Sequence, residues 1–351
     1  MDEDKRRLIR RESDCENRRI FGVANFKHSR HFSALWAFCR SYPGKAASKN
    51  YKEKNVGETT VITRRDFLRG GAGAALAAAL SSPIRGEEQG APKAKVILIR
   101  DRGVLGRNEK VREEILRSMM DEGVKSLLSE KEALAAWRKL FRSPDVVGIK
   151  SNEWDSMPTP KELEDAVKRR LLDVGIPGRN IDIDDRGVLH NPIFRKATAL
   201  INVRPLRTHH WSGVGTCLKN YIMFVPDPSD DHGEGCSNLG KIWTYPIVKG
   251  KTRLNILSAL QPQFYGRGAH FFDKRYIWPY KGLIVGTDPV AVDAVGAHLL
   301  QVKRIAYFGE DRALDLPPIH ITAAEKKYHL GVSDLNRIEL IKLGWQEDAL
   351  I

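Results

Sequence analysis

The chain has 351 residues, 42% of them hydrophobic and 8% aromatic, which is enough to build the core of one large or two small domains. Its formal net charge of +14 is typical of a nucleic-acid-binding protein, but roughly +9 of this charge lies before residue 87. No basic stripe interleaved with aromatic residues follows in the remainder, so we expect no nucleic-acid partner.

Several familiar kinds of catalytic and metal site are missing from the sequence. None of the four cysteines forms a CxxC pair, which excludes a zinc ribbon or an iron–sulfur cluster held by a local Cys run. There is no GxSxG elbow, phosphate-binding Walker loop, dinucleotide-binding glycine pattern or HExxH motif. Cys217 and Cys236 either pair in an oxidising compartment or remain two buried thiols.

Residues 61–86 carry paired arginines, Arg64 and Arg65, followed by Phe67-Leu68 and a mildly apolar run of small residues. This segment resembles a twin-arginine signal peptide, which implies the twin-arginine translocation machinery as a partner and a periplasmic or otherwise exported location. The apolar run is too short and too rich in glycine to predict a stable membrane span. An Ala-rich surface helix behind two chance arginines is the alternative. Residues 1–60 are basic without apolar periodicity, and we expect a non-structural leader or a gene start placed too far upstream.

Residues 95–345 alternate short β-rich runs with amphipathic helical stretches. The predicted strands are Val96–Arg100, Val146–Lys150, Ile181–Asp184, Ala199–Val203, Leu254–Ser258 and Leu283–Gly286. The predicted helices are Glu109–Met120, Lys131–Phe141, Pro160–Val174 and Val290–Leu300. This rhythm predicts an α/β domain with a mostly parallel sheet flanked by helices. Asp227–Tyr280 breaks the rhythm and is expected to be a long irregular loop insertion, either a functional lid or a peripheral segment.

The most informative stretch is Ala199–Asp227. It begins with an apolar strand that we expect to break at Pro205, and continues with Arg207, Thr208 and two adjacent histidines. Ser212–Phe224 is then expected to continue as a helix that carries Lys219 and Asn220. Cationic and metal-capable side chains between a strand and a helix predict a ligand site, because open α/β sheets bind ligands beyond their strand ends.

Four stretches resemble one family: VVGIKSNEW, NPIFRKATALINV, INVRPLRTHHWSGVGTCLKN and GLIVGTDPVAVDAVGAHLL. They resemble the domain-of-unknown-function family 362 (DUF362), over most of the chain from Lys95 to about Leu340. Family members have lysines where this chain has Arg204 and Arg207. Arginine keeps the positive charge, but its planar guanidinium group replaces the compact ammonium group of lysine. Some members carry ferredoxin-type Cys runs, which are missing here, so no iron–sulfur cluster is expected. The family implies no particular reaction.

A second resemblance, to nickel-pincer racemases of the lactate racemase type, is confined to His209-His210, Ser212-Gly213 and Lys219. Those enzymes also place a His, a Gly-containing turn and a Lys at their cofactor. The resemblance implies a metal-dependent enzyme.

Three histidines are candidate ligands of a transition metal, His209, His210 and His232, since imidazole suits such ions. His209 and His210 are adjacent and are expected to point in different directions, so at most one faces a shared site. His232 lies in an acidic loop with Asp227, Asp230, Asp231 and Glu234, which is either a metal site or a solvated turn. A local hydrogen bond that stabilises the turn is the alternative for each histidine.

Polar residues also follow two other strands. Lys150 and Asn152 come after one strand and are candidate ligand-binding residues. Asp288 follows another, where it either caps the next helix or contributes to an anion site at the helix N-terminus. Asp293 lies one turn further on, among apolar residues, and is a candidate orienting carboxylate.

Two functional hypotheses follow. The first is an exported enzyme that uses a metal or bound cofactor, with His209 or His210 as ligand or base, Lys219 as electrostatic stabiliser and Asp293 as orienting group. The second is a non-catalytic periplasmic protein that binds an anionic small molecule with Arg204, Arg207, Lys219 and helix N-termini. The twin-arginine route exports folded proteins, often with cofactors loaded, which favours the first hypothesis.

Overall fold

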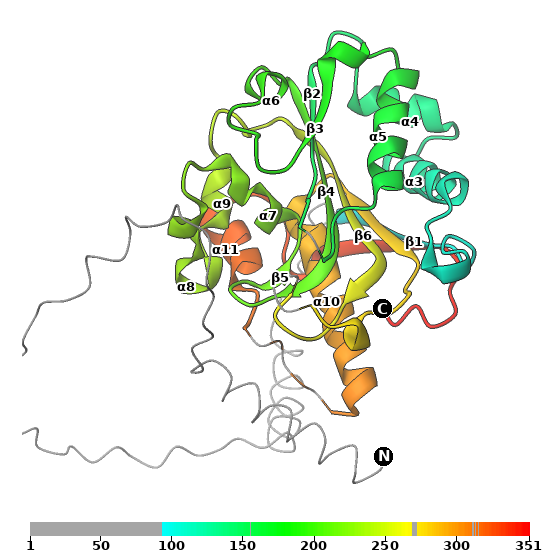
Figure 1. Cartoon of the computed structure of the whole chain (residues 1–351), viewed down its shortest axis with the longest axis vertical. Helices are drawn as coiled ribbons and strands as arrows, with labels where there is room; N and C mark the ends of the chain where they lie inside the picture. Colours follow the sequence, from blue (N-terminus) through cyan, green and yellow to red (C-terminus); the bar gives the residue numbers. More distant parts are fainter. Residues whose placement is uncertain (1–92, 155, 269–271, 311, 313, 315) are drawn as a thin grey trace, which may run out of the picture. The chain divides into compact units, whose positions relative to one another are not determined.

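The computed structural model describes residues 93–351, apart from 155, 269–271, 311, 313 and 315. In these residues one eight-stranded sheet has the order β3-β2-β4-β6-β7-β1-β8, and β5 pairs with β4 off this path (Figure 1). The strands are β1 (Ala94–Arg100), β2 (Val147–Lys150), β3 (Ile181–Asp184), β4 (Ala199–His209), β5 (Gly213–Gly215), β6 (Thr252–Gln263), β7 (Gly282–Gly286) and β8 (Ile338–Gly344).

Strands β3, β2, β4 and β6 are parallel neighbours, as are β1 and β8, whereas β7 runs antiparallel to both β6 and β1. Four strands separated by helices therefore form the parallel half of the sheet, because a parallel pairing needs a crossover connection. The predicted α/β fold with a mostly parallel sheet is confirmed.

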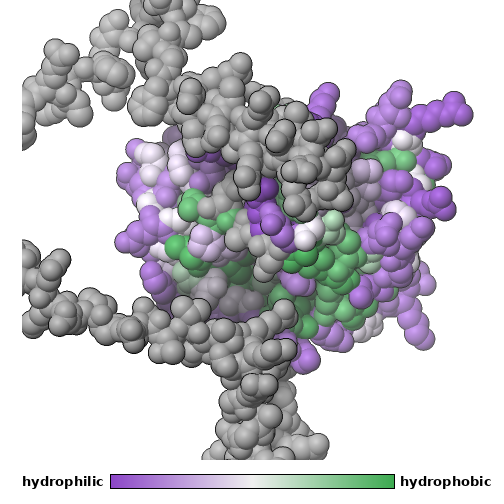
Figure 2. All heavy atoms as spheres, turned by 90° about the horizontal axis from the view of Figure 1, so that it is seen from below, coloured by the Kyte–Doolittle hydropathy of each residue, from purple (hydrophilic) through white to green (hydrophobic). Residues whose placement is uncertain are grey.

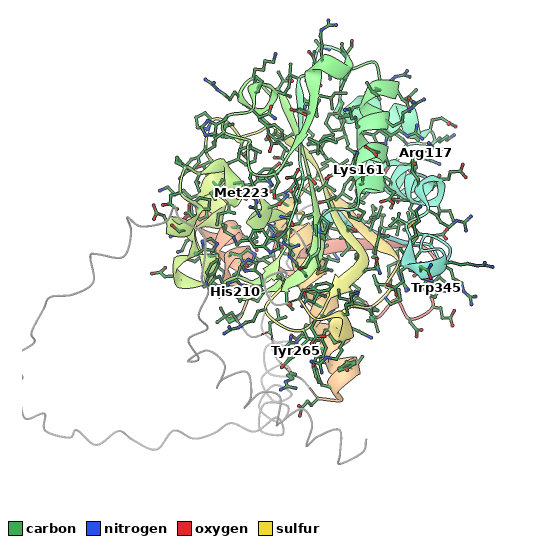
Figure 3. The ribbon with its side chains drawn as sticks, in the orientation of Figure 1. Arg117, Lys161, His210, Met223, Tyr265 and Trp345 are labelled. Carbon is green, nitrogen blue, oxygen red and sulfur yellow. The ribbon has the colours of Figure 1, made fainter. Side chains whose placement is uncertain are left out.

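Helices cover both faces of the sheet (Figure 1). One face carries α3 (Glu113–Leu128), α4 (Ala133–Leu140) and α5 (Lys161–Asp173). The other carries α6 (Pro192–Arg195), α7 (Cys217–Asn220), α8 (Gly233–Cys236), α9 (Leu239–Ile242), α10 (Pro289–Phe308) and α11 (Ile319–Tyr328). Arg117 and Lys161 accordingly lie on the opposite side of the sheet from His210 and Met223 (Figure 3).

The sheet separates two apolar cores. Along β1, Ile97 and Ile99 belong to the core under α3 and α5, whereas Val96 and Leu98 belong to the core under α10. This alternation follows from the two-residue period of a strand whose two faces are both buried. Because both faces of β1 are buried, apolar residues occupy successive positions along it.

The expected break at Pro205 is wrong, because β4 continues through it to His209. The pairing of β4 with β6 shifts register between Pro205 and Arg207, and such a bulge is the setting in which a central strand accepts a proline. The predicted helix over Ser212–Phe224 is also wrong in its first part. That part forms β5, followed by α7 and the 3-10 helix η3 (Tyr221–Phe224).

The expected long insertion at Asp227–Tyr280 is divided in two by β6. Before β6 the chain folds into short helices, among them η4 (Pro228–His232), α8 and α9; after it, irregular chain contains η6 (Lys274–Tyr276). The strand β8 and the helix α11 have no counterpart among the predicted elements.

The surface seen from below has apolar areas between charged side chains (Figure 2). Exposed large apolar side chains of the domain include Ile305 and Tyr307 of α10 and Leu316 and Ile319 at the start of α11. Within the described residues, no helix is both long and apolar enough to cross a membrane. Cys217 and Cys236 are buried free thiols. The export signal predicted at residues 61–86 and the leader predicted at 1–60 lie outside the described residues.

Candidate functional site

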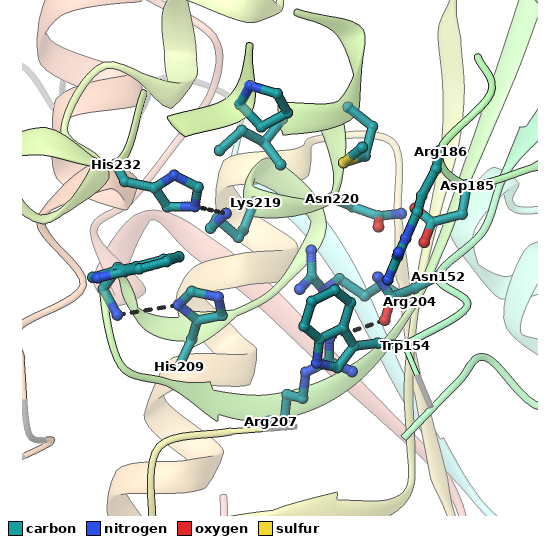
Figure 4. Close-up of a pocket in the computed structure, with 14 residues that line it drawn as sticks. Asn152, Trp154, Asp185, Arg186, Arg204, Arg207, His209, Lys219, Asn220 and His232 are labelled. Atoms are coloured by element: carbon teal, nitrogen blue, oxygen red, sulfur yellow. Dashed lines mark hydrogen bonds between the residues drawn. The ribbon is translucent and has the colours of Figure 1, made fainter. Parts of the chain in front are cut away.

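A cavity of about 280 Å³ lies beyond the carboxyl ends of β2 and β3 and beside the last residues of β4 (Figure 4). Polar residues from these strands and from α7 face aromatic and apolar ones across it. The residues that line it are Asn152, Trp154, Asp185, Arg186, Arg204, Arg207, His209, Trp211, Lys219, Asn220, Ile222, Met223, Pro228 and His232. It occupies the position where open α/β sheets bind their ligands.

The last residues of β4 supply three side chains to this cavity, Arg204, Arg207 and His209. Strand β2 ends at Lys150, opposite Asn202, and β5 pairs with β4 only from Arg207 onward. Residues 203–206 of β4 therefore have no strand of the described chain on the β2 side, and the cavity lies beside them.

Arg204 is a buried cation without a counter-ion in the described part of the chain. Its side chain is 4% exposed, its Nε has no hydrogen-bond partner, and it forms no ion pair with any described residue. A Cβ atom at Gly215 would lie 3.1 Å from Arg204 Nη2, so the absence of a side chain there makes room for the guanidinium. Burial lowers the pKa of Arg204 from 12.5 to about 10, although Asp185 and Asp293 act in the opposite direction.

Arg207 is held by neutral groups. Its Nη1 donates to the Met157 carbonyl oxygen at 2.8 Å and its Nη2 to Asn152 Oδ1 at 2.9 Å, while its Nε has no partner. Burial and the neighbouring Arg204 lower the pKa of this group too. These bonds fix the orientation of the fork but leave its charge uncompensated.

Lys219 enters the cavity from α7 and is 3% exposed. Its Nζ lies 3.0 Å from His232 Nε2, and no carboxylate of the described residues is paired with it (Figure 4). Burial, followed by Arg204, lowers the pKa of Lys219 from 10.5 to about 7. Burial therefore favours the neutral amine.

Among the described residues, Asp185 is the one carboxylate that lines the cavity, and it already has hydrogen-bond partners. Asp185 accepts a hydrogen bond from Lys150 Nζ at 2.5 Å and another from the Glu153 backbone N–H at 3.0 Å. Lys150 is fully buried behind the cavity wall, where Asn220 also donates to its backbone carbonyl. The Lys150–Asp185 pair is therefore neutral overall and leaves the charge of the arginines in place.

The predicted histidines lie close together at one end of the cavity. The rings of His209 and His210 stack, with centroids 5.0 Å apart, so the expectation that they point in different directions is wrong. Even so, His209 lines the cavity, whereas His210 Nδ1 lies 3.2 Å from the Arg267 carbonyl oxygen. His209 Nδ1 accepts the backbone N–H of Trp211 at 3.2 Å. Burial and three nearby cations lower the pKa of His209, which keeps the ring neutral.

The described residues contain no group of three or more His, Cys, Asp or Glu side chains placed to hold a metal ion. His209 and His232 both reach the cavity. The assignment of His209, His210 and His232 to a transition metal stays a prediction.

Asp288 and Asp293 lie outside the cavity lining. Asp288 caps α10 by accepting the backbone N–H groups of Val290 and Ala291, and it also accepts that of Val332. Asp293 accepts from Thr216 Oγ1 and from the backbone N–H groups of Cys217 and Leu218, all within 2.8 Å. It thereby fixes the start of α7, the helix that presents Lys219, and burial raises its pKa to about 6.

Seven of the residues that line the cavity were not among the predicted site residues: Trp154, Asp185, Arg186, Trp211, Ile222, Met223 and Pro228. Asp185 directly follows β3, so the strand-end rule that selected Lys150 and Asn152 would also have selected it. Trp154 lies four residues beyond β2, and Trp211 lies in the β4–β5 turn. Both tryptophans fall within the stretches that carry the family resemblance.

The family model described as a domain of unknown function (DUF362) matches residues 173–298, from the end of α5 into α10. This match covers less than half of the chain, but it includes Arg204, Arg207, His209, Lys219 and His232. No curated protein and no solved structure matches the chain. The chain is thus similar, around its cavity, to a family whose description states no function.

Proposed function

We propose that this cavity binds a small organic anion and that Arg204 and Arg207 hold its charged group. The observation that carries the proposal is the unpaired state of Arg204. A buried charge is costly unless it is paired, and Arg204 meets no counter-ion among the described residues. A carboxylate or phosphate oxygen in the cavity would supply the missing partner.

The charge around the cavity supports this assignment. Arg204, Arg207 and Lys219 face the cavity, and Asp185, the only carboxylate that the described residues contribute to its lining, is paired with Lys150. Planar guanidinium forks recognise carboxylates and phosphates through two parallel hydrogen bonds. Three uncompensated cations in one small cavity therefore favour an anion over a neutral or positively charged ligand.

The rest of the cavity supports a small, partly apolar molecule. A volume of about 280 Å³ is near the lower end for ligand sites. Trp154, Trp211, Ile222 and Met223 line it, so the uncharged part of the ligand would pack against aromatic and aliphatic side chains. The Asn152 amide oxygen is already bonded to Arg207, and its remaining groups lie at the cavity wall.

An enzyme is the second candidate, and one observation favours it. The Lys219 amine faces the cavity in contact with His232. A partly deprotonated amine beside an imidazole is a chemically reactive arrangement and is not required for anion capture. A metal or cofactor remains part of this candidate through His209 and His232, and export remains a proposal that rests on the sequence of residues 61–86.

The proposal is tested by isothermal titration calorimetry of the full chain with acetate, pyruvate, benzoate and inorganic phosphate. We expect at least one anion to bind, with an affinity that falls as salt screens the arginines. Arg204→Met should weaken this binding by more than tenfold, whereas Arg138→Met, a matched change on the exposed face of α4, should leave it unchanged. Binding that is equally strong in Arg204→Met, or none for any of the four anions, would refute the proposal.

A further inference from the structure

We infer that Lys219 is a nucleophile that forms an imine with the carbonyl carbon of a small oxo acid whose carboxylate is held by Arg204 and Arg207. The inference rests on the proposed anion binding and goes beyond it by naming a reaction and a substrate class. It assigns to Lys219 a covalent role in place of the electrostatic role expected from the sequence.

The first argument is the position of the amine. Lys219 is 3% exposed, but it lines the cavity together with both arginines, so a ligand held by them would lie against its Nζ. Lys150, the other buried lysine of the described residues, is paired with Asp185. Lys219 instead lies 3.0 Å from the Nε2 atom of a neutral imidazole. A lysine placed to hold charge permanently would be expected to have a carboxylate partner.

The second argument is the position of the two arginines. Arg204 and Arg207 line the same cavity as Lys219, and planar guanidinium forks recognise carboxylates. A small oxo acid whose carboxylate they hold would place its carbonyl group in the cavity that the Lys219 amine enters.

The chemistry then balances without an oxidant or a reductant. The Nζ lone pair attacks the carbonyl carbon, and the π electrons of the C=O bond move onto oxygen. His232 Nε2 lies in position to accept a proton from the attacking nitrogen and to return it to this oxygen, which gives the carbinolamine. The second N–H proton passes in the same way to the hydroxyl group, which leaves as water while nitrogen forms the C=N bond. The products are an imine and one water molecule, and hydrolysis reverses the sequence.

The inference is tested by reductive trapping of the full chain with pyruvate and sodium cyanoborohydride near pH 7, followed by intact-mass measurement and peptide mapping. We expect one adduct per chain at Lys219. Lys219→Arg should abolish it, and Lys219→Met serves if the arginine variant does not fold. Lys241→Arg, a matched change on the exposed surface of α9, should retain it. Acetone, which has a carbonyl but no carboxylate, should give at least tenfold less adduct.

The outcomes distinguish a failure of the inferred imine from a failure of the proposed anion binding. If pyruvate binds in calorimetry but Lys219 is not labelled, the imine is refuted and anion binding stands. If adducts spread over the surface lysines at equal rates in Lys219→Arg and the unaltered chain, the imine is refuted as well. If no oxo acid and no other anion binds, the proposed function itself fails.

Discussion

Replacing Arg204 by methionine should stabilise the protein while it removes the anion site. Arg204 is charged at pH 7 in both the folded and the unfolded chain, but only the folded state buries the charge. Its pKa falls from 12.5 to about 10 on folding. This decrease in the pKa corresponds to roughly 3–4 kcal/mol, at about 1.4 kcal/mol for each pH unit. Because the group is a base with a lowered pKa, this cost is fully present below about pH 10.

The gain should be smaller than this upper value, since methionine also loses packing contacts that the guanidinium makes. The volume it vacates joins the cavity, so no closed void is created. We expect a gain of about 1–3 kcal/mol in the free energy of unfolding, which is the range seen when buried ionic groups are replaced by apolar ones. In a domain of this size that raises the melting temperature by several degrees, at about 2–4 °C per kcal/mol.

The assay is thermal unfolding of the full chain at pH 7, with and without the tightest anion found by calorimetry. The unaltered chain should be stabilised by the anion, by about 2.7 kcal/mol at a hundred times Kd, and Arg204→Met should not respond. Arg253→Met is the matched control, because Arg253 forms two hydrogen bonds with Asp145, at 2.6 and 3.0 Å. That variant should lose stability, since it leaves Asp145 without its counter-ion. The reasoning is refuted if Arg204→Met is destabilised as Arg253→Met is, or if it keeps the anion response.

Four further results are expected. The affinity for acetate should weaken between pH 6 and pH 8 as Lys219, with a pKa of about 7, loses its proton, and binding at pH 8 should take up protons. Calorimetry in buffers of different ionisation enthalpy measures both effects. A pH profile that is unchanged in Lys219→Met would contradict this prediction. Asp293→Asn should lower the free energy of unfolding by about 1–3 kcal/mol, because a buried N–H at the start of α7 loses its acceptor. An unchanged melting temperature together with lost anion binding would instead place Asp293 at the site. His209→Ala should weaken anion binding and His210→Ala should not, because only His209 lines the cavity. The predicted metal is checked by elemental analysis of both variants and of the unaltered protein, before and after mild acidification. Replacing Arg64 and Arg65 by lysine should retain the protein in the cytoplasm in a fractionation assay; equal export of both forms would reject the signal.

The sequence predicted the parallel core because its strands are short β-rich runs that alternate with helical stretches. β8 was missed because the exposed residues Glu339 and Lys342 interrupt its apolar residues without a regular alternation. The strand-end rule selected Lys150, Asn152, Arg204, Arg207, Lys219 and Asn220 from the right part of the fold. It could not show that Lys150 forms an ion pair with Asp185, because that pairing joins residues 35 positions apart.

The continuation of β4 past Pro205 is the feature that sequence reasoning handled worst, although the site depends on it. Proline was taken as the end of the strand, but β4 runs on to His209, and both Arg207 and His209 line the cavity. Arg207 pairs there with Gly215 of β5 and Gln263 of β6. These pairings are set by other segments of the chain and are not encoded within the segment itself.

The treatment of arginines elsewhere in the domain strengthens the argument from Arg204. Arg170 forms ion pairs with both Asp121 and Asp173, and its pKa is raised as a result. Arg253 is bonded to both oxygens of Asp145. Both are more exposed than Arg204. Arg100 and Arg304 are as buried as Arg204, but their guanidinium groups donate to backbone carbonyl oxygens. A buried guanidinium whose charge is not compensated lowers stability, and the proposed binding of an anion would account for that cost.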